Sequence, residues 1–262
     1  MIPQADITAW RSQAPWISDA QVEQDLLISR AMVVLFSHEV IAENIALRGG
    51  TALHKLFLAP ASRYSEDIDL VQTQAGAIGP VLDAIHEALD GFLGTPGRTR
   101  KQRSVLLAYR VDSEVPPVIP LRLKLEINTR EHFSVLGFHQ YPFTVDCRWF
   151  SGKCNIVTYR LNELLGTKLR ALYQRRKGRD LFDLWLGLTA GKADPAAVVR
   201  SFLQYMTAMD LSISQDEFRR NLALKMKHKS FLGDTTGLLR PEVTYDVQEA
   251  FRIVETELLE LL

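Results

Sequence analysis

The sequence predicts an α+β protein, with an α/β half of about 160 residues followed by an all-helical half. Before Arg160, short runs that alternate apolar and polar residues are interleaved with segments of helical periodicity. Alternation with a period of two indicates strands, and a period near 3.6 indicates helices. After Arg160 only the helical periodicity continues. We therefore expect two domains, an α/β domain over residues 1–160 and a helical domain over residues 161–262.

The first expected elements are a long helix, a short helix and a strand. Residues 18–21 read Ser-Asp-Ala-Gln, which resembles a capping box, and apolar residues recur behind it at helical spacing, so we expect a helix over 19–43. A Gly-Gly pair precedes a short helix over 51–58, which Pro60 closes because proline cannot continue a helix. A strand follows over 65–71.

The next helix has the clearest boundaries, since Pro80 opens it and Gly94 follows its last apolar residue. Residues 98–103 are basic and are expected to form a loop. Further strands are then predicted over 105–111, 121–127, 143–147 and 155–159. Helices fill the rest of the chain, over 161–176, 181–189, 195–209, 215–227 and 243–262.

The composition is that of an ordinary globular protein. Hydrophobic residues make up 47% of the 262 residues, charged residues make up 24%, and the formal net charge is +0. Without a global positive field, any contact with nucleic acid must rest on local clusters of basic residues. Such clusters occur at 98–103, 175–179 and 225–229.

The chain shows no sign of export or membrane insertion. Its N-terminal segment lacks the basic and apolar regions of a signal peptide, and its longest apolar run, 31–36, is too short to span a membrane. The two cysteines, Cys147 and Cys154, are too few for a disulfide framework. We expect a soluble, cytoplasmic protein without a membrane partner.

Two aspartates one residue apart mark the candidate site. Asp67 and Asp69 project from the same face of a strand, because side chains alternate between faces. Adjacent carboxylates repel each other unless a cation lies between them, and Mg²⁺ prefers oxygen ligands. Upstream, Gly49 and Gly50 allow close approach of the backbone to an anion. Together these features predict a site for a nucleoside triphosphate with Mg²⁺, or Mn²⁺ in its place.

A third carboxylate is expected from the strand over 121–127. Its odd positions are aliphatic and its even positions polar, so Glu126 lies on the face opposite the core. If this strand neighbours the strand of the aspartates, Glu126 can join them as a metal ligand. A solvated glutamate on a half-exposed sheet is the alternative.

The helix over 161–176 carries two cations in an unusual place. Lys168 and Arg175 fall within the angular sector of the apolar residues and not on the opposite polar side. A lysine there either covers apolar surface with its stem or reaches into a cleft, where it could hold phosphate oxygens. The RDxxD pattern that follows, with Asp180 and Asp183, fits either a structural network or a functional site.

In their order along the chain, these motifs resemble the AbiEii/AbiGii toxin family of nucleotidyltransferases, in the DNA polymerase β superfamily. The stretches GGTALHK and RYSEDIDL are similar to the first family motif, and LKLEIN to the strand with the third acidic residue. ELLGTKLRALYQR is similar to the lysine-bearing helix, and RDLFDL to the final motif. The resemblance implies a polymerase β-like nucleotidyltransferase domain, a mixed sheet with flanking helices, followed by a helical bundle.

The resemblance also implies roles for the matching residues. Asp67, Asp69 and Glu126 are expected to hold Mg²⁺, Lys168 to contact the nucleotide, and either Asp180 or Asp183 to complete the catalytic set. The expected nucleotide-binding residues of the first motif are Gly49, Gly50, Thr51, Lys55, Arg63 and Ser65.

The function implied is that of a bacterial toxin from a toxin–antitoxin or phage-defence system, with a cognate antitoxin as partner. Such an enzyme would transfer a nucleoside monophosphate from an NTP to an RNA, with the 3′ end of tRNA as the expected acceptor. Two alternatives remain open: transfer to a protein or small molecule, and a non-catalytic module that binds nucleotide or antitoxin. The sequence does not select the NTP.

Overall fold

The protein is built around one mixed seven-stranded sheet, followed by a helical region. The computed structural model describes residues 2–262. The strand order is β3-β4-β5-β2-β1-β7-β6. The strands are β1 (Ile45–Arg48), β2 (Asp67–Gln72), β3 (Gly97–Arg100), β4 (Ser104–Asp112), β5 (Pro120–Asn128), β6 (His139–Asp146) and β7 (Ser151–Thr158). β2 pairs in parallel with β5, β1 pairs in parallel with β7, and the other neighbours are antiparallel.

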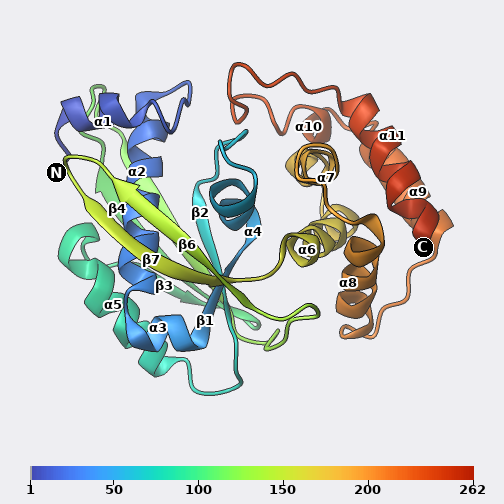
Figure 1. Cartoon of the computed structure of the whole chain (residues 1–262), viewed down its shortest axis with the longest axis horizontal. Coiled ribbons are helices and arrows are strands. Elements are labelled where there is room, and N and C mark those ends of the chain that lie inside the picture. Colours follow the sequence, from blue (N-terminus) through green and yellow to red (C-terminus); the bar gives the residue numbers. More distant parts are fainter. Residues whose placement is uncertain (1) are drawn as a thin grey trace.

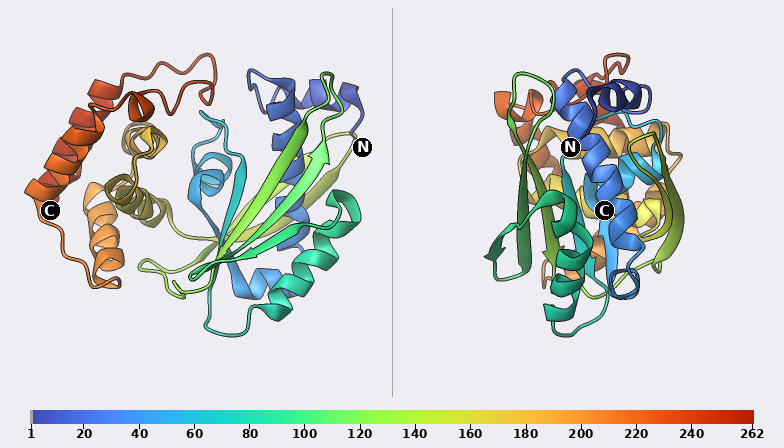
Figure 2. Two further views of the ribbon diagram at one scale, coloured as in Figure 1. Left: turned by 180° about the vertical axis from the view of Figure 1, so that it is seen from behind. Right: turned by 90° about the vertical axis from the view of Figure 1, so that its left-hand side faces the viewer.

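One face of the sheet carries the hydrophobic core. Helices α2 (Asp19–Phe36) and α5 (Gly79–Leu93) lie on this face, as the right view of Figure 2 shows. Beneath them, the alternate residues of β2, β4 and β5 are buried, among them Ile68, Leu107 and Leu125. The polar residues of the same strands therefore lie on the opposite face of the sheet.

The helical region lies beside that opposite face (Figure 1). Its central helix, α6 (Leu161–Gln174), packs on α7 (Gly178–Thr189) and α8 (Pro195–Thr207), and α7 packs on α11 (Val247–Glu257). The other elements of this region are α9 (Gln215–Lys225), α10 (Lys229–Leu232) and a short 3₁₀ turn, Leu259–Leu261. Among residues 2–262, no helix is long and apolar enough to cross a membrane.

The expected α+β class is confirmed, but several expected elements are wrong in detail. The helix predicted over 19–43 is two helices, α2 and α3 (Glu39–Asn44), because His38 adopts an extended conformation between them. Part of the expected basic loop is the edge strand β3, whose four residues are all exposed and so show no alternation. The last helix was expected to begin at residue 243, but it begins at Val247. Asp246 caps this start, since its side chain accepts a hydrogen bond from the Gln248 amide.

Two short elements near the N-terminus were absent from the sequence prediction, α1 (Gln4–Trp10) and β1. β1 ends directly at the Gly-Gly pair, where α4 (Gly49–Ala52) begins and continues as a π-helical turn, Leu53–Phe57. The chain therefore passes from the centre of the sheet into a short helix that faces α6. This β1–α4 junction places the glycines beside the polar residues of β2.

Candidate active site

The three predicted carboxylates lie on one face of two adjacent strands. β2 and β5 are neighbours, and their parallel register places Asp69 directly opposite Glu126. Asp67 lies two residues before Asp69 and therefore on the same face. The intervening Ile68 is fully buried in the core. The sheet thus brings together side chains that are far apart in the sequence.

Asp69 is the carboxylate most closely enclosed by the chain. A Cβ atom at Gly49 would lie only 2.2 Å from its Oδ2 atom, so only glycine fits there, and Gly49 also has a positive φ of 75°. Within residues 2–262, the Asp69 carboxylate makes no hydrogen bond or ion pair. Burial raises its pKa, although the nearby charges of Arg48 and Lys168 act in the opposite direction.

The other two carboxylates hold ammonium groups. Asp67 Oδ1 lies 3.2 Å from Nζ of Lys124. Glu126 accepts hydrogen bonds from Nζ of Lys101 at 2.9 Å and from Oγ of Ser104 at 2.7 Å. Burial alone would raise the pKa of Glu126, but the hydrogen bonds from Ser104 and Lys101 lower it overall. Each of these two carboxylates therefore has a lysine as its partner.

A cavity of about 420 Å³ separates this face of the sheet from α6. Asp69, Glu126 and Gly49 line its sheet side, and Lys168 lines its helix side. Five basic side chains border the cavity, which suits a polyphosphate, because charge-assisted hydrogen bonds to phosphate are strong. These are Arg48, Arg103, Lys168, Arg170 and Arg175.

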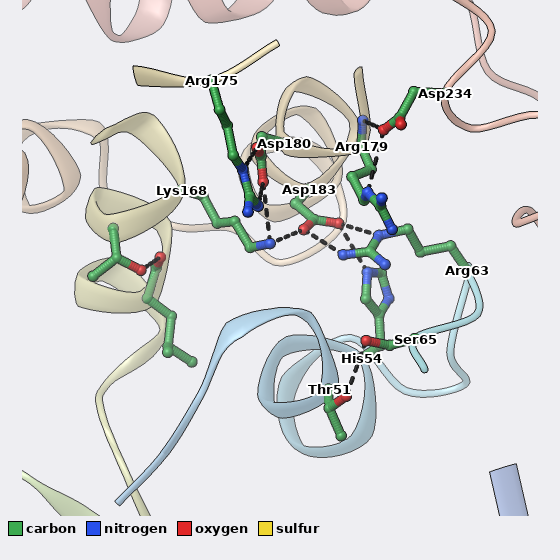
Figure 3. A network of polar contacts seen from close by, with 12 residues as sticks. Thr51, His54, Arg63, Ser65, Lys168, Arg175, Arg179, Asp180, Asp183 and Asp234 are labelled. Atoms are coloured by element: carbon green, nitrogen blue, oxygen red, sulfur yellow. Dashed lines mark hydrogen bonds and ion pairs between the residues drawn. The ribbon is translucent and has the colours of Figure 1, made fainter. Parts of the chain in front are cut away.

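Lys168 is held by both aspartates of the RDxxD pattern. Its Nζ lies 2.8 Å from Oδ2 of Asp183 and 3.3 Å from Oδ1 of Asp180 (Figure 3). Both aspartates are fully buried, and neither lines the cavity. Their contacts lead to the cavity through Lys168 and Arg175, which do line it.

Each of the two aspartates also binds an arginine. Arg63 binds Asp183 through two hydrogen bonds of 2.6 and 2.7 Å, and His54 Nε2 lies 3.0 Å from the same carboxylate. Arg175 binds Asp180 in the same two-pronged way, at 2.7 and 2.8 Å. Burial would raise the pKa of Asp183, but Arg63 and Lys168 hold it well below its usual range.

The neutral histidine completes this network. Burial lowers the pKa of His54 to about 4, and the charge of Arg63 acts in the same direction. His54 is thus uncharged near neutral pH. It donates from Nε2 to the Asp183 carboxylate without adding a further positive charge beside Arg63.

The first-motif residues divide into two groups. Gly49 lines the cavity. Gly50 packs against the network instead, since a Cβ there would lie 2.5 Å from Nη2 of Arg63. The Thr51 hydroxyl donates to the Asp67 carbonyl at 2.6 Å and lies 2.9 Å from the Ser65 hydroxyl. These two hydroxyls tie α4 to the start of β2, and neither Thr51 nor Ser65 lines the cavity.

Two further residues predicted to bind nucleotide make other contacts in this structure. Arg63 is 2% exposed and is occupied by Asp183. Lys55, in the π-helical turn that follows α4, forms an ion pair of 2.7 Å with Asp25 of α2 and does not line the cavity. Ser65 also lies outside β2, which begins at Asp67.

Sequence reasoning missed a carboxylate bridge at the edge of the cavity. Glu131 binds Nη1 of Arg48 at 2.8 Å and Nη1 of Arg170 at 2.9 Å. Arg48 directly precedes the Gly-Gly pair, and this position could have identified it. Glu131 follows β5 in an irregular segment that has no periodicity, so the sequence offers no comparable signal.

A divalent cation fits the carboxylate row by its chemistry. Asp67, Asp69 and Glu126 supply only oxygen donors, and Asp69 faces the cavity free of any competing cation. As the side chains stand, residues 2–262 contain no group of three His, Cys, Asp or Glu close enough to bind one ion. Lys124 and Lys101 must therefore release Asp67 and Glu126 before all three carboxylates can share a metal.

The fold is that of nucleotidyltransferases. JHP933 from Helicobacter pylori is 18% identical over 93% of this chain and 90% of its own, with a TM-score of 0.53. The MenT4 nucleotidyltransferase toxin of Mycobacterium tuberculosis is 16% identical over 100% of this chain and 99% of its own, with a TM-score of 0.54. A comparison with curated proteins gives no match.

The family is shown by the sequence. The model of the AbiEii nucleotidyl transferase toxins of type IV toxin–antitoxin systems matches residues 30–253, and the chain belongs to this family. This confirms the resemblance drawn from the motifs. The protein is a nucleotidyltransferase toxin, and its family implies an NTP substrate, a divalent metal and an antitoxin.

Proposed function

We propose that this toxin transfers a nucleoside monophosphate from an NTP to an RNA hydroxyl, with the 3′ end of tRNA as the acceptor. One observation carries the proposal: the cavity has carboxylates on its sheet side and cations on its helix side. A metal–triphosphate complex needs both. A free RNA 3′ end supplies the hydroxyl, and a carboxylate of the sheet is available to accept its proton.

In this mechanism, Asp67, Asp69 and Glu126 would hold Mg²⁺, and the metal would supply positive charge that neutralises the phosphate oxygens. Lys168 and Arg175 bind the β- and γ-phosphates and offset the charge that develops on the leaving group. The RNA 3′-oxygen forms a bond to the α-phosphorus as the bond to the bridging α–β oxygen breaks, and pyrophosphate leaves. Asp69 or Glu126 accepts the hydroxyl proton.

The Lys168 network supports this assignment of roles. Three cationic side chains, Arg63, Lys168 and Arg175, and one neutral histidine surround two buried aspartates, and their joint effect is to fix one ammonium group at the cavity. A lysine held in advance costs little reorganisation when the substrate binds. Asp180 and Asp183 are therefore proposed as positioning residues for Lys168.

A transfer assay tests the proposal directly. Purified protein is incubated with Mg²⁺, bulk bacterial tRNA and each α-³²P-labelled NTP in turn. We expect labelled tRNA with the wild type and none with Asp69→Ala or Asp67→Ala. Asp83→Ala, an exposed aspartate on α5 at the far face of the sheet, is the matched control and should retain activity.

The same assay separates the alternatives. Label on protein or on a small molecule, with none on RNA, would replace the acceptor while keeping the enzyme class. Activity that survives in Asp69→Ala would refute the metal assignment. Addition of a chelator should abolish transfer, and Mn²⁺ in place of Mg²⁺ shows whether the site discriminates between the two ions.

A further inference from the structure

A second groove lies on the same sheet face as the carboxylates, farther toward the edge strand. It has a volume of about 520 Å³, and we call it the arginine groove. The strands β3, β4 and β5 supply its floor and sides, chiefly through Gly97, Thr99, Leu106, Ala108, Arg110 and Arg122. None of these residues was singled out by the sequence motifs.

The groove continues directly from the candidate active site along β5. Arg122, Lys124 and Glu126 are alternate residues of this strand and share one face. The register places Leu106 opposite Glu126, Ala108 opposite Lys124, and Arg110 opposite Arg122. From Glu126 to Arg122 the strand covers about 13 Å, at roughly 3.3 Å per residue. A single row therefore leads from the metal-binding carboxylates to the groove.

Arg110 and Arg122 face each other across the antiparallel pair, an arrangement that weakens a sheet because like charges repel. Both are exposed, and within residues 2–262 neither side chain makes a hydrogen bond or an ion pair. Asp112, two residues beyond Arg110 on the same face, forms no ion pair with it either. The fold thus keeps two uncompensated positive charges side by side, which a bound anion would stabilise.

The shape of the groove favours a backbone of phosphates over stacked bases. Its floor contains the small residues Gly97 and Ala108, and a Cβ at Gly97 would meet only the Ala108 carbonyl, at 3.9 Å. No aromatic side chain lines it. Arg98 of the edge strand β3 borders the groove, but it pairs with Leu107 of the core face, so Arg110 and Arg122 are the cations that share the face of the groove floor.

We propose that the arginine groove binds the phosphate backbone of the acceptor RNA just upstream of its reactive 3′ end. This proposal rests on the proposed function and extends it. The 3′ end lies in the cavity at Glu126, and the preceding nucleotides follow β5 past Lys124 to Arg110 and Arg122. Because contacts to phosphates carry no sequence information, this surface positions the RNA without selecting its bases.

The test compares the double variant Arg110→Gln/Arg122→Gln with a control of equal charge change, Arg200→Gln/Arg252→Gln. The control arginines are exposed, lie on α8 and α11, and also lack ion-pair partners within residues 2–262. Binding of a 5′-labelled, 12-nucleotide single-stranded RNA is measured without NTP over a series of salt concentrations. Loss of two phosphate contacts should reduce the slope of log K against log[salt] by about 1.4.

The groove variant should also raise the KM for tRNA in the transfer assay by about tenfold or more, while the KM for NTP stays unchanged. Arg110→Lys/Arg122→Lys, which keeps both charges, should restore most of the affinity. Thermal melting of the groove variant should match or exceed that of the wild type, since a like-charge repulsion is removed. This measurement excludes misfolding as the cause of weaker binding.

Three outcomes would overturn the proposal. RNA affinity and salt slope equal to those of the control variant would show that the groove does not contact RNA. A change in the KM for NTP alone would assign the groove to the nucleotide, and competition by inorganic pyrophosphate would identify that case. Loss of antitoxin binding with unchanged RNA binding would assign it to the protein partner. A wild type that binds and modifies no RNA refutes the proposed function itself.

Discussion

Asp69 faces the cavity from the strand β2 and is partly covered by the backbone of Gly49. Its carboxylate lacks the lysine partner that Asp67 and Glu126 each have. Burial of a charge without a partner costs free energy of folding. Asp69 therefore faces the cavity as a carboxylate that no lysine of the described chain neutralises.

Asp69→Asn should therefore stabilise the metal-free protein near neutral pH. The raised pKa of Asp69 means that the native state binds its proton more tightly than the unfolded state does. The wild type consequently loses stability as pH rises through that pKa, and a neutral asparagine avoids the loss. Urea unfolding with a chelator present should give a higher midpoint for the variant at pH 7.

The difference should vanish in acid, where Asp69 of the wild type is itself protonated. Asp83→Asn, on an exposed position of α5, serves as the control and should leave the midpoint unchanged at every pH. A lower midpoint for Asp69→Asn at pH 7 would mean that this carboxylate is held by favourable contacts and not strained by burial.

The position of a single side chain was predictable where the periodicity of its strand or helix determines the face on which it lies. The period of two put Asp67, Asp69 and Glu126 on one face, and the angular position of Lys168 on its helix brought it to the cavity. Lys55 and Arg63 were assigned by their place in a motif alone. Each pairs with an aspartate distant in the sequence, Asp25 or Asp183, and no local pattern reveals such a partner.

Among the elements, α7 is tied to the rest of the protein by a buried charge network. Asp183 on this helix binds Arg63, which precedes β2, and Lys168 on α6. His54, from the turn that follows α4, binds the same carboxylate. Three segments of the chain thus meet at one side chain, which fixes how α6 and α7 lie against α4.

Asp183→Asn should cost about 3–5 kcal/mol of unfolding free energy, because one buried partner is removed while the cations stay buried. The measurement is urea unfolding at pH 7. The matched control is Glu242→Gln, a carboxylate that is 67% exposed and pairs with Arg240 at 3.1 Å. That exposed pair should contribute less than about 1 kcal/mol.

The same variant also tests the positioning role. If Asp183 holds Lys168 at the cavity, residual folded enzyme should show a lower kcat at saturating NTP. An unfolding free energy within about 1 kcal/mol of the control variant, with unchanged kcat, would mean that the network is neither structural nor positioning.

The helices whose bounds the sequence predicted well are those with a proline at the start or a glycine after the end. Pro80 and Gly94 mark the two ends of α5 to within one residue, and α8 begins at Pro195. The exposed edge strand β3 has no buried face, so nothing in its sequence alternates. The short strand β1 is buried at its first three residues and therefore does not alternate either.

At the scale of the whole molecule, the sheet and the helical region are joined beside the cavity by Glu131. This carboxylate bridges Arg48, at the end of β1, and Arg170 on α6. Burial would raise its pKa, but the two arginines lower the pKa of Glu131 to about 2. The bridge fixes the distance between the two sides of the cavity.

Glu131→Gln should destabilise the protein at pH 7 by about 3–5 kcal/mol, since the buried Arg170 and the largely buried Arg48 lose their partner. A depressed carboxylate pKa contributes stability fully above the ordinary value of 4.5, and this contribution is lost as pH falls through about 2. The gap between wild type and variant should therefore narrow from about pH 5 downward. Urea unfolding across this range measures it.

Glu257 is an exposed glutamate at the end of α11, and Glu257→Gln is the control. Its unfolding free energy should equal that of the wild type at every pH. If the difference in unfolding free energy between wild type and Glu131→Gln stays constant down to pH 2, the bridge does not depend on the charge of Glu131.

The order of the motifs predicted which parts of the chain meet. It did not predict which of their residues line the cavity and which only contact Lys168. The expected α/β half and helical half each supply one side of the cavity. The sequence left open whether Asp180 or Asp183 belongs to the site, and in the structure both bind Lys168 from behind the cavity. The boundary of two domains at about residue 160 stays a prediction.

The division of the cavity between two distant parts of the chain sets the order in which its sides are synthesised. Arg48, Gly49 and Asp69 leave the ribosome early, whereas Lys168 and its aspartates follow much later. A nascent or prematurely terminated chain that ends before Asp183 carries the sheet side of the cavity without the complete network that holds Lys168. The cavity therefore acquires its helix side only after α6 and α7 have been made, and a chain truncated before α6 would expose the carboxylate row of the sheet without the opposing cations.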